Sequence, residues 1–163
     1  FSFVGSYRPE RFDAINNLIE NFSDKKFLIV GPGWNKTMFQ DLNKIEIVNQ
    51  MVDLNSFLDY TIQSKISLNI IDFLNYPSSN LRFFEIALSS VPQISSFIPE
   101  FEKIYIHNEH VFYYKNYKEL IEVANNIFNN YEQALLVAIN FRRLIESSDN
   151  YIFRCNSILS NCK

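Results

Sequence analysis

The sequence predicts an α/β fold: a doubly wound, mostly parallel six-stranded sheet, Rossmann-like, with closing C-terminal helices. Two observations predict it. Short apolar runs alternate with longer segments of helical period along the 163 residues, and these runs are almost continuously apolar, as is typical of parallel strands buried on both faces. Right-handed crossovers between such strands then produce a doubly wound sheet.

Six short apolar runs are the expected strands. They span residues 1–5, 26–31, 44–49, 65–71, 92–95 and 110–114. Ligands of such sheets bind beyond the carboxyl ends of the strands, near the point where the strand order reverses. Three loops are therefore candidates for a binding site, at residues 5–9, 31–36 and 71–80.

The segments of helical period follow the strands. They cover residues 9–22, 53–60, 80–90, 117–130 and 131–147, and a last amphipathic turn covers 151–159. Pro9 is allowed in the first turn of a helix, and Phe12, Ile15 and Ile19 then fall on one face. Asp53 is expected to cap the second helix, because its carboxylate can accept hydrogen bonds from the free N–H groups there.

Composition and charge exclude some function classes. A net charge of −3 and a pI of about 5.4 repel a phosphate backbone, so no nucleic-acid partner is expected. No run approaches the roughly 18 apolar residues of a membrane-spanning helix, so no integral membrane segment is expected. The length suits one domain at residues 1–163. Because the chain begins at Phe1 and not at Met, we expect it to be a piece of a longer protein.

The cysteines and histidines predict neither a disulfide nor a metal site. On a helix, Cys155 and Cys162 would lie about 10 Å apart, beyond disulfide reach, so two free thiols in the reducing cytoplasm are expected. His107 and His110, with Glu109 between them, lack the third protein ligand that a zinc site needs.

The loop after the first strand, GSYRPER, is a candidate phosphate site. Gly5 permits a tight turn, and the helix that follows presents free N–H groups with Arg8 and Arg11 nearby. Arginine makes forked contacts with phosphate oxygens. The alternative is a solvated arginine at a helix start, paired with Glu10 or Asp13.

The second strand ends in GPGW. Gly31 and Gly33 allow the backbone to approach another group closely. Trp34 then either covers a flat ligand group or lies partly buried in a β-turn.

The segment SSNLRFFEIALSS is the most informative. Apolar residues surround most of this helix, so it is expected to be largely buried, yet Ser78, Arg82, Glu85 and Ser89 form one polar stripe. Buried charges need partners. Either Arg82 and Glu85 satisfy each other, or the stripe faces a polar cleft in which Glu85 accepts hydrogen bonds from sugar hydroxyls.

These motifs, taken in order, resemble a known family. The sequence carries F-V-G-S-Y-x-P-E-R, I-V-G-P-G-W, K-I-S-L-N-I, N-L-R-F-F-E-I-A, V-F-Y-Y-x-N-Y-K-E-L and N-Y-I-F-R-C-N-S-I-L. Together they resemble the C-terminal half of group-1-like glycosyltransferases of the two-Rossmann-domain (GT-B) type, in the branch that includes spore-maturation-type proteins. The resemblance spans essentially the whole chain.

The resemblance implies the activity. The C-terminal half of such an enzyme binds a nucleotide-diphosphate sugar, and the N-terminal half, which this chain lacks, binds the acceptor. Transfer of a hexosyl group, usually with retention and without a metal, occurs between the halves, so no cofactor is expected. The protein is expected in the cytoplasm, with peripheral attachment to the inner membrane face as a further expectation, and this fragment alone is expected to be inactive.

The resemblance also implies site residues. Glu85 matches the acidic residue that holds the nucleotide ribose, Arg82 matches the arginine that faces the diphosphate or sugar, and these two are the catalytic candidates. Asn80 lies in the donor-facing loop. The remaining donor-binding candidates are Gly5, Arg8 and Arg11, near the diphosphate, and Gly33.

Two positions depart from the family pattern. Relatives carry a second Glu where this chain has Pro77, and they often carry Gly where it has Ser90. Pro77 motivates an alternative function: a non-catalytic scaffold or partner-binding module with a degenerate transferase fold.

Overall fold

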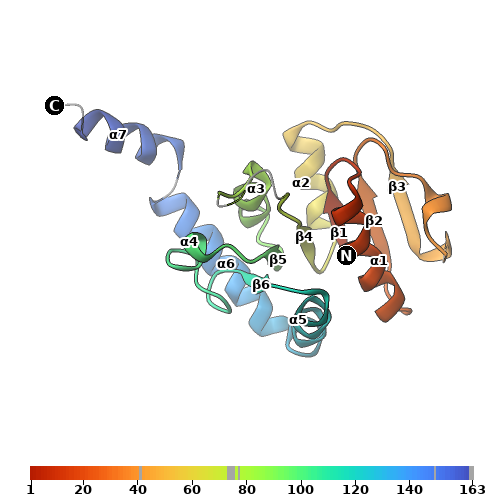
Figure 1. Ribbon diagram of the computed structural model, residues 1–163. Coiled ribbons are helices and arrows are strands. Elements are labelled where there is room, and N and C mark those ends of the chain that lie inside the picture. The colour runs from red at the N-terminus through yellow and green to blue at the C-terminus, as the bar shows by residue number, and fades with distance from the viewer. Residues whose placement is uncertain (41, 73–75, 77, 149, 162–163) are drawn as a thin grey trace.

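A six-stranded parallel sheet forms the centre of the molecule (Figure 1). The computed structural model describes residues 1–40, 42–72, 76, 78–148 and 150–161. The strands are β1 (Ser2–Val4), β2 (Phe27–Val30), β3 (Ile45–Val48), β4 (Ser67–Asn69), β5 (Gln93–Ser96) and β6 (Phe112–Tyr114). The expected six strands are therefore confirmed. Five are shorter than their apolar runs, and β5 is shifted by one residue from its run.

The strand order is β3-β2-β1-β4-β5-β6, and each neighbouring pair is parallel. The chain builds outward from β1 to β3, then crosses back to place β4 on the other side of β1. The strand order therefore reverses between β1 and β4, and this is the switch point at which a doubly wound sheet binds ligands.

Helices cover both faces of the sheet. They are α1 (Pro9–Asn21), α2 (Leu54–Ile62), α3 (Leu81–Leu88), α4 (Pro99–Glu102), α5 (Tyr117–Asn129), α6 (Tyr131–Ser148) and α7 (Tyr151–Asn161), with short 3-10 turns η1 (Lys36–Met38) and η2 (Leu42–Lys44). On one face α1 and α5 pack together, and on the other α2 and α3 do so, with α6 against α3. The sequence did not predict α4, η1 or η2, each of which has four residues or fewer.

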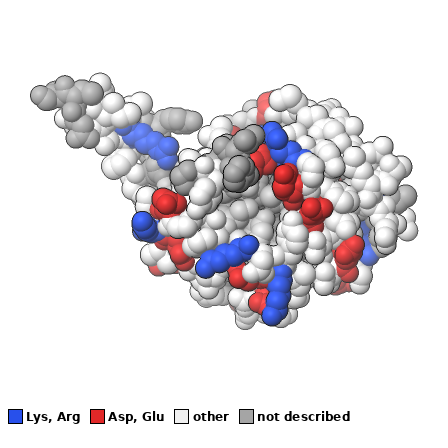
Figure 2. Space-filling model, viewed as in Figure 1, with Lys and Arg blue, Asp and Glu red and all other residues white. Residues whose placement is uncertain are grey.

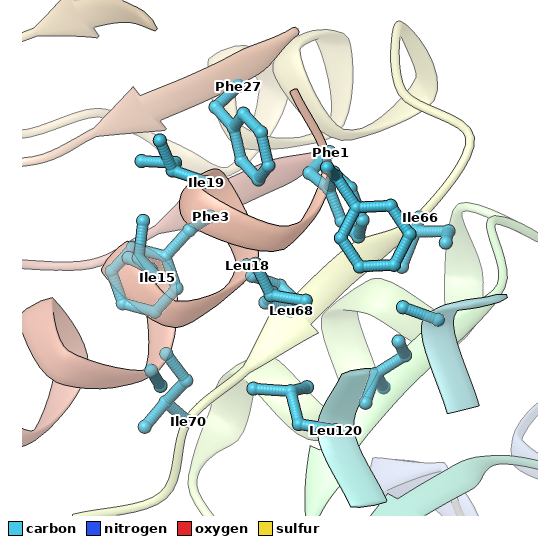
Figure 3. Packing of buried hydrophobic residues seen from close by; sticks show 14 of the residues in the cluster. Phe1, Phe3, Ile15, Leu18, Ile19, Phe27, Ile66, Leu68, Ile70 and Leu120 are labelled. Carbon is cyan, nitrogen blue, oxygen red and sulfur yellow. The ribbon is translucent and has the colours of Figure 1, made fainter. Parts of the chain in front are cut away.

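Alternating strand residues supply the two cores. Phe3 and Ile29 point into the core under α1 and α5, whereas Val4 and Val30 point toward α2 and α3. Figure 3 shows the first core, where Ile15 and Leu18 of α1 lie against the strands. The strands are almost continuously apolar because helices cover both faces of the sheet.

Local capping begins several of the helices. Pro9 occupies the first turn of α1, and the side chain of Asp53 accepts a hydrogen bond from the Ser56 N–H at 2.8 Å, as expected. Asn80 and Asn116 cap α3 and α5 in the same way.

The end of the chain behaves differently from the helices before it. Figure 1 shows α7 projecting away from the sheet, and Ile152, Phe153, Ile158 and Leu159 on it are exposed. The two closing helices that the sequence predicted at residues 117–130 and 131–147 correspond to α5 and α6. Cys155 lies on α7 as a free, exposed thiol, and Cys162 lies outside the described residues.

Ser90 follows α3 with a φ of 57°, in the left-handed region. This is the position at which the related sequences often carry Gly, and glycine adopts such a φ without steric cost. Ser90 therefore adopts a conformation that is unfavourable for any residue with a Cβ.

Candidate functional site

A cavity of about 350 Å³ opens at the switch point. It lies at the carboxyl ends of β1 and β4, beside the first turns of α1 and α3. Its walls are Phe3, Val4, Gly5, Ser6, Arg11, Asn69, Ile70, Asn80, Leu81, Arg82 and Glu85. Five of the seven residues predicted for the site are in this wall, and Arg8 and Gly33 are not.

A larger cavity, of about 560 Å³, lies at the opposite edge of the sheet. Its wall includes the residues at the amino ends of β2 and β3 and contains Lys25, Lys26, Lys36, Lys44 and Lys65. None of the predicted site residues is there. The smaller cavity is the better candidate, because it lies at the edge where doubly wound sheets bind ligands.

The turn after β1 is braced by the turn after β2. The Gly5 N–H donates to the Val30 carbonyl at 2.8 Å, and the Trp34 indole N–H donates to the Gly5 carbonyl at 2.7 Å. Gly31 has a φ of 142°, and a Cβ there would lie 2.2 Å from the Gly5 oxygen. The close approach that these glycines were expected to allow is therefore between the two turns.

Trp34 and Gly33 belong to this brace. Trp34 is only 1% exposed, so the suggestion that it covers a flat ligand group is wrong, and it is more deeply buried than the β-turn alternative supposed. Gly33 has a φ of 87°, and its N–H donates to the Asn49 side-chain oxygen at 2.9 Å. A Cβ at Gly33 would lie 3.0 Å from the Cβ of Tyr7, which lies in the turn after β1.

Arg8 and Arg11 share one carboxylate, that of Asp72. The Asp72 Oδ2 atom lies 2.7 Å from Nη2 of Arg11 and 3.2 Å from Nε of Arg8. The sequence-based alternative named Glu10 or Asp13 as the partner, and the partner that the structure shows is instead the residue shortly after β4. Asp72 is in a candidate loop, but nothing in the local pattern linked it to Arg11, 61 residues earlier, or to Arg8.

Arg11 is held from several sides. Its Nη1 donates to the Ser6 carbonyl at 2.8 Å, and its guanidinium lies 5.7 Å from the centre of the Phe3 ring. Burial lowers the pKa of Arg11, and the charge of Asp72 partly counteracts this. A Cβ at Gly5 would lie 2.9 Å from the Phe3 ring and 3.3 Å from Nη1 of Arg11, so glycine makes room for this arrangement.

Arg82 and Glu85 form an ion pair and also line the cavity. The first sequence-based alternative, in which Arg82 and Glu85 satisfy each other, is therefore observed. Hydrogen bonds from sugar hydroxyls to Glu85 stay a prediction. The Arg82 guanidinium also lies over the Phe57 ring, 4.2 Å from its centre. The predicted polar stripe faces the cavity only at Arg82 and Glu85. The Ser89 hydroxyl donates to the Ile86 carbonyl at 2.6 Å, and neither Ser78 nor Ser89 is in the cavity wall.

The start of α3 lies at the rim of the cavity. The Asn80 side-chain oxygen accepts from the Phe83 N–H at 3.1 Å, which orients the helix. Leu81 is 56% exposed, so this helix is less buried than the apolar pattern predicted, because its first turn opens onto the cavity. Pro77, the residue that departs from the family pattern, lies outside the described residues.

The two histidines have structural contacts. Nδ1 of His107 accepts from the Tyr113 N–H at 2.9 Å, and Nδ1 of His110 accepts from the Ile106 N–H at 3.1 Å. Burial lowers the pKa of each imidazole. Within the described ranges, no group of three or more His, Cys, Asp or Glu side chains is placed to hold a metal ion.

Comparison with known proteins identifies the family. A family model described as glycosyl transferase-like matches residues 8–160. The chain belongs to this glycosyltransferase-like family. The predicted resemblance is thereby confirmed at the level of the family, and the spore-maturation branch stays a prediction. Among curated proteins, none matches this chain significantly.

Solved structures share the fold of this glycosyltransferase-like chain. HepE from Anabaena, solved in complex with UDP-glucose, has a TM-score of 0.76 at 11% identity over 99% of this chain and 47% of HepE. The C-terminal domain of LpcC, a group 1 glycosyl transferase from Francisella tularensis, has a TM-score of 0.71 at 12% identity over 92% of this chain and 85% of that domain. Sucrose-phosphate synthase from Thermosynechococcus elongatus has a TM-score of 0.71 at 15% identity, over 99% of this chain and 44% of that one.

The glycosyltransferase-like chain thus has the fold of a GT-B C-terminal domain and spans about half the length of HepE. Across the part of the chain that the structure describes, no helix is both long and apolar enough to cross a membrane. On the face shown in Figure 2, acidic and basic side chains lie interspersed.

Proposed function

We propose that this chain is the donor-binding domain of a glycosyltransferase and binds a nucleotide-diphosphate sugar in the switch-point cavity. The observation that carries the proposal is that Arg11 of α1 and the Arg82–Glu85 pair of α3, two helices far apart in the sequence, line one cavity between β1 and β4. The family assignment and the fold shared with HepE, a protein solved with UDP-glucose, support it.

The chemistry of the wall suits such a ligand. Glu85 would accept hydrogen bonds from the ribose hydroxyls, with its position held by Arg82. Arg11, the first turn of α1 and the nearby Arg8 would face the diphosphate, since helix N-termini and arginine both favour phosphate oxygens. Asn80 would present the first turn of α3 to the donor.

The reaction would follow from these roles. Negative charge builds on the diphosphate as it leaves, and fixed cations and N–H groups lower the barrier electrostatically. We infer retaining, metal-independent hexosyl transfer with no cofactor, in which any base that activates the acceptor belongs to an N-terminal acceptor-binding domain. We further place the enzyme in the cytoplasm, with peripheral contact at the inner membrane face.

Calorimetry with UDP, GDP, dTDP and CMP tests donor binding. We expect one nucleoside diphosphate to bind to this chain, and Glu85→Ala to weaken that binding. Glu146→Gln is a matched control, because Glu146 pairs with Arg142 at 2.8 Å on α6 and is not in the cavity wall. Failure of all four nucleotides to bind would contradict the proposal.

A non-catalytic scaffold is the second candidate. It is favoured by the fact that Arg8, Arg11 and Arg82 are each already paired with a carboxylate. Transfer activity of the longer protein carrying Arg82→Ala or Glu85→Ala discriminates between the two. Unchanged transfer in both variants would support the scaffold.

A further inference from the structure

We propose that Asp72 is the positioning residue of this site, holding Arg11 in the cavity wall and releasing Arg8 when a diphosphate binds. This inference rests on the proposed function, because it concerns how the same site accepts its ligand. Asp72 would then set the affinity for the diphosphate without touching it.

The first support is the sharing of a single oxygen. Asp72 Oδ2 contacts both arginines, at 2.7 Å for Arg11 and 3.2 Å for Arg8. The other oxygen, Oδ1, is buried and has no hydrogen-bond partner within the described ranges. One carboxylate oxygen therefore contacts two guanidinium groups, so the two arginines share a single partner.

The second support is the difference between the two arginines. The Arg11 side chain is 12% exposed, bonds to Ser6 as well as Asp72, and lines the cavity. The Arg8 side chain is 47% exposed, and its contact with Asp72 is the longer of the two. Arg11 is therefore anchored, whereas Arg8 can rotate from Asp72 toward solvent or a ligand.

The third support is the location of Arg8. It is the residue before α1, has an extended backbone, and uses no side-chain atom to cap the helix. The first N–H groups of α1 and a rotated Arg8 would thus meet the same anion. The contact that the half-exposed Arg8 makes with Asp72 at 3.2 Å is weak, whereas a forked contact with phosphate is strong, so exchange of partners favours the diphosphate.

Asp72→Asn tests the exchange. This variant keeps the shape of the side chain and removes the charge that competes for Arg8. We expect UDP and inorganic pyrophosphate each to bind about two- to fivefold more tightly, the range that an exposed ion pair represents. The gain should depend on Arg8, so Arg8→Ala should weaken binding more in the Asp72→Asn background than in the wild-type background.

The dependence of the affinity gain on Arg8 distinguishes a positioning role of Asp72 from a merely structural one. If Asp72 only stabilised the fold, Asp72→Asn would weaken binding or leave it unchanged, and Arg8→Ala would have equal effects in both backgrounds. Either result would overturn the proposal. Glu146→Gln again controls for the loss of one carboxylate from an Arg–Glu pair.

A measurement on the wild-type chain avoids any dependence on how the variants fold. Side-chain NMR of the arginine Nε–H groups, during titration with pyrophosphate, should shift the Arg8 signal clearly more than that of Arg11. Equal movement of both signals, or movement of Arg11 alone, would contradict the release of Arg8.

The two ligands distinguish this inference from the proposed function. If pyrophosphate behaves as expected and no nucleotide binds more tightly than it, the exchange stands and the donor assignment fails. If a nucleotide binds while Asp72→Asn brings no gain, the donor site stands and the exchange fails. If neither a nucleotide nor pyrophosphate binds to the wild-type chain or to Asp72→Asn, both the exchange and the donor assignment are wrong.

Discussion

The two edges of the sheet hold cations in different ways. At the carboxyl edge, Arg11 and Arg82 are paired with carboxylates from elsewhere in the fold or the same helix, and both line a cavity. At the amino edge, Lys25 and Lys65 lie over the rings of Phe128 and Tyr131, each 4.9 Å from the ring centre. The amino-edge cavity is larger and richer in lysine.

The difference shows that volume and positive charge do not by themselves make a binding site. A lysine has a flexible stem and a strongly hydrated head, whereas an arginine held by a carboxylate keeps one orientation. The carboxyl edge is also rigid, because two glycine turns brace each other there. Each prediction below tests or sharpens this contrast, and the largest expected effect comes first.

Gly31→Ala should cause the largest loss of stability. The added Cβ would lie 2.2 Å from the Gly5 oxygen, at a φ of 142° that alanine rarely adopts. We expect the free energy of unfolding to fall by about 3 kcal/mol or more. Chemical denaturation measures it. Gly33→Ala is the comparison, with a smaller loss because the nearest atom, Cβ of Tyr7, lies at 3.0 Å.

Arg11→Ala should destabilise the carboxyl edge next. It would leave the largely buried Asp72 carboxylate facing only the exposed Arg8, at a cost of about 2 kcal/mol. Lys25→Ala at the amino edge removes the cation that pairs with the exposed Asp24 and lies over the Phe128 ring, and should lower the unfolding free energy much less than Arg11→Ala does. Equal losses in the two variants would contradict the contrast between the edges.

Glu85→Gln should weaken nucleotide binding by about tenfold, the value of a hydrogen bond to a charged group. Glu46→Gln is the matched control, since Glu46 lies in the wall of the amino-edge cavity. Calorimetry with the nucleotide that binds wild type compares them. A loss in Glu46→Gln as large as that in Glu85→Gln would place the ligand at the wrong edge for the proposed function.

Ser90→Gly should stabilise the chain by about 0.5 to 1 kcal/mol. Ser90 has a φ of 57°, and glycine removes the cost of that conformation while adding some entropy to the unfolded chain. Thermal or chemical denaturation measures the gain. The turn lies between α3 and β5, away from the cavity wall, so nucleotide affinity should not change.

The two histidines, which line neither cavity, should make stability depend slightly on pH. The pKa values of His107 and His110 are lowered in the folded chain, so the unfolded chain binds more protons between the folded pKa and the ordinary histidine value of about 6.5. The contribution of the two histidines to stability should therefore be fully present above that pH. It should fall as the pH drops below it and level off below the folded pKa. Denaturation at several pH values, with His107→Asn as the variant that reduces the effect, checks this. Comparisons of the two edges belong above pH 8, because burial also lowers the pKa of the Phe1 amino group at the amino edge from 8.0 to about 6.

Much of the fold was predictable because its signals are local. Apolar runs located the strands, and Pro9, Asp53 and Asn80 marked helix starts through interactions within one turn. The short α4 escaped because four residues carry no detectable period. Five of the seven site residues that the family resemblance implied line the switch-point cavity, and their roles stay predictions.

Local patterns in the sequence were enough to predict which segments form strands and helices. Only the tertiary structure decided that β1 lies beside β4, and hence that Asp72 meets Arg8 and Arg11. It also decided that Trp34 is buried against the first turn rather than facing a ligand. The physical reason is that capping and periodicity act within a few residues, whereas the partner of a charge or of an indole N–H depends on strand order.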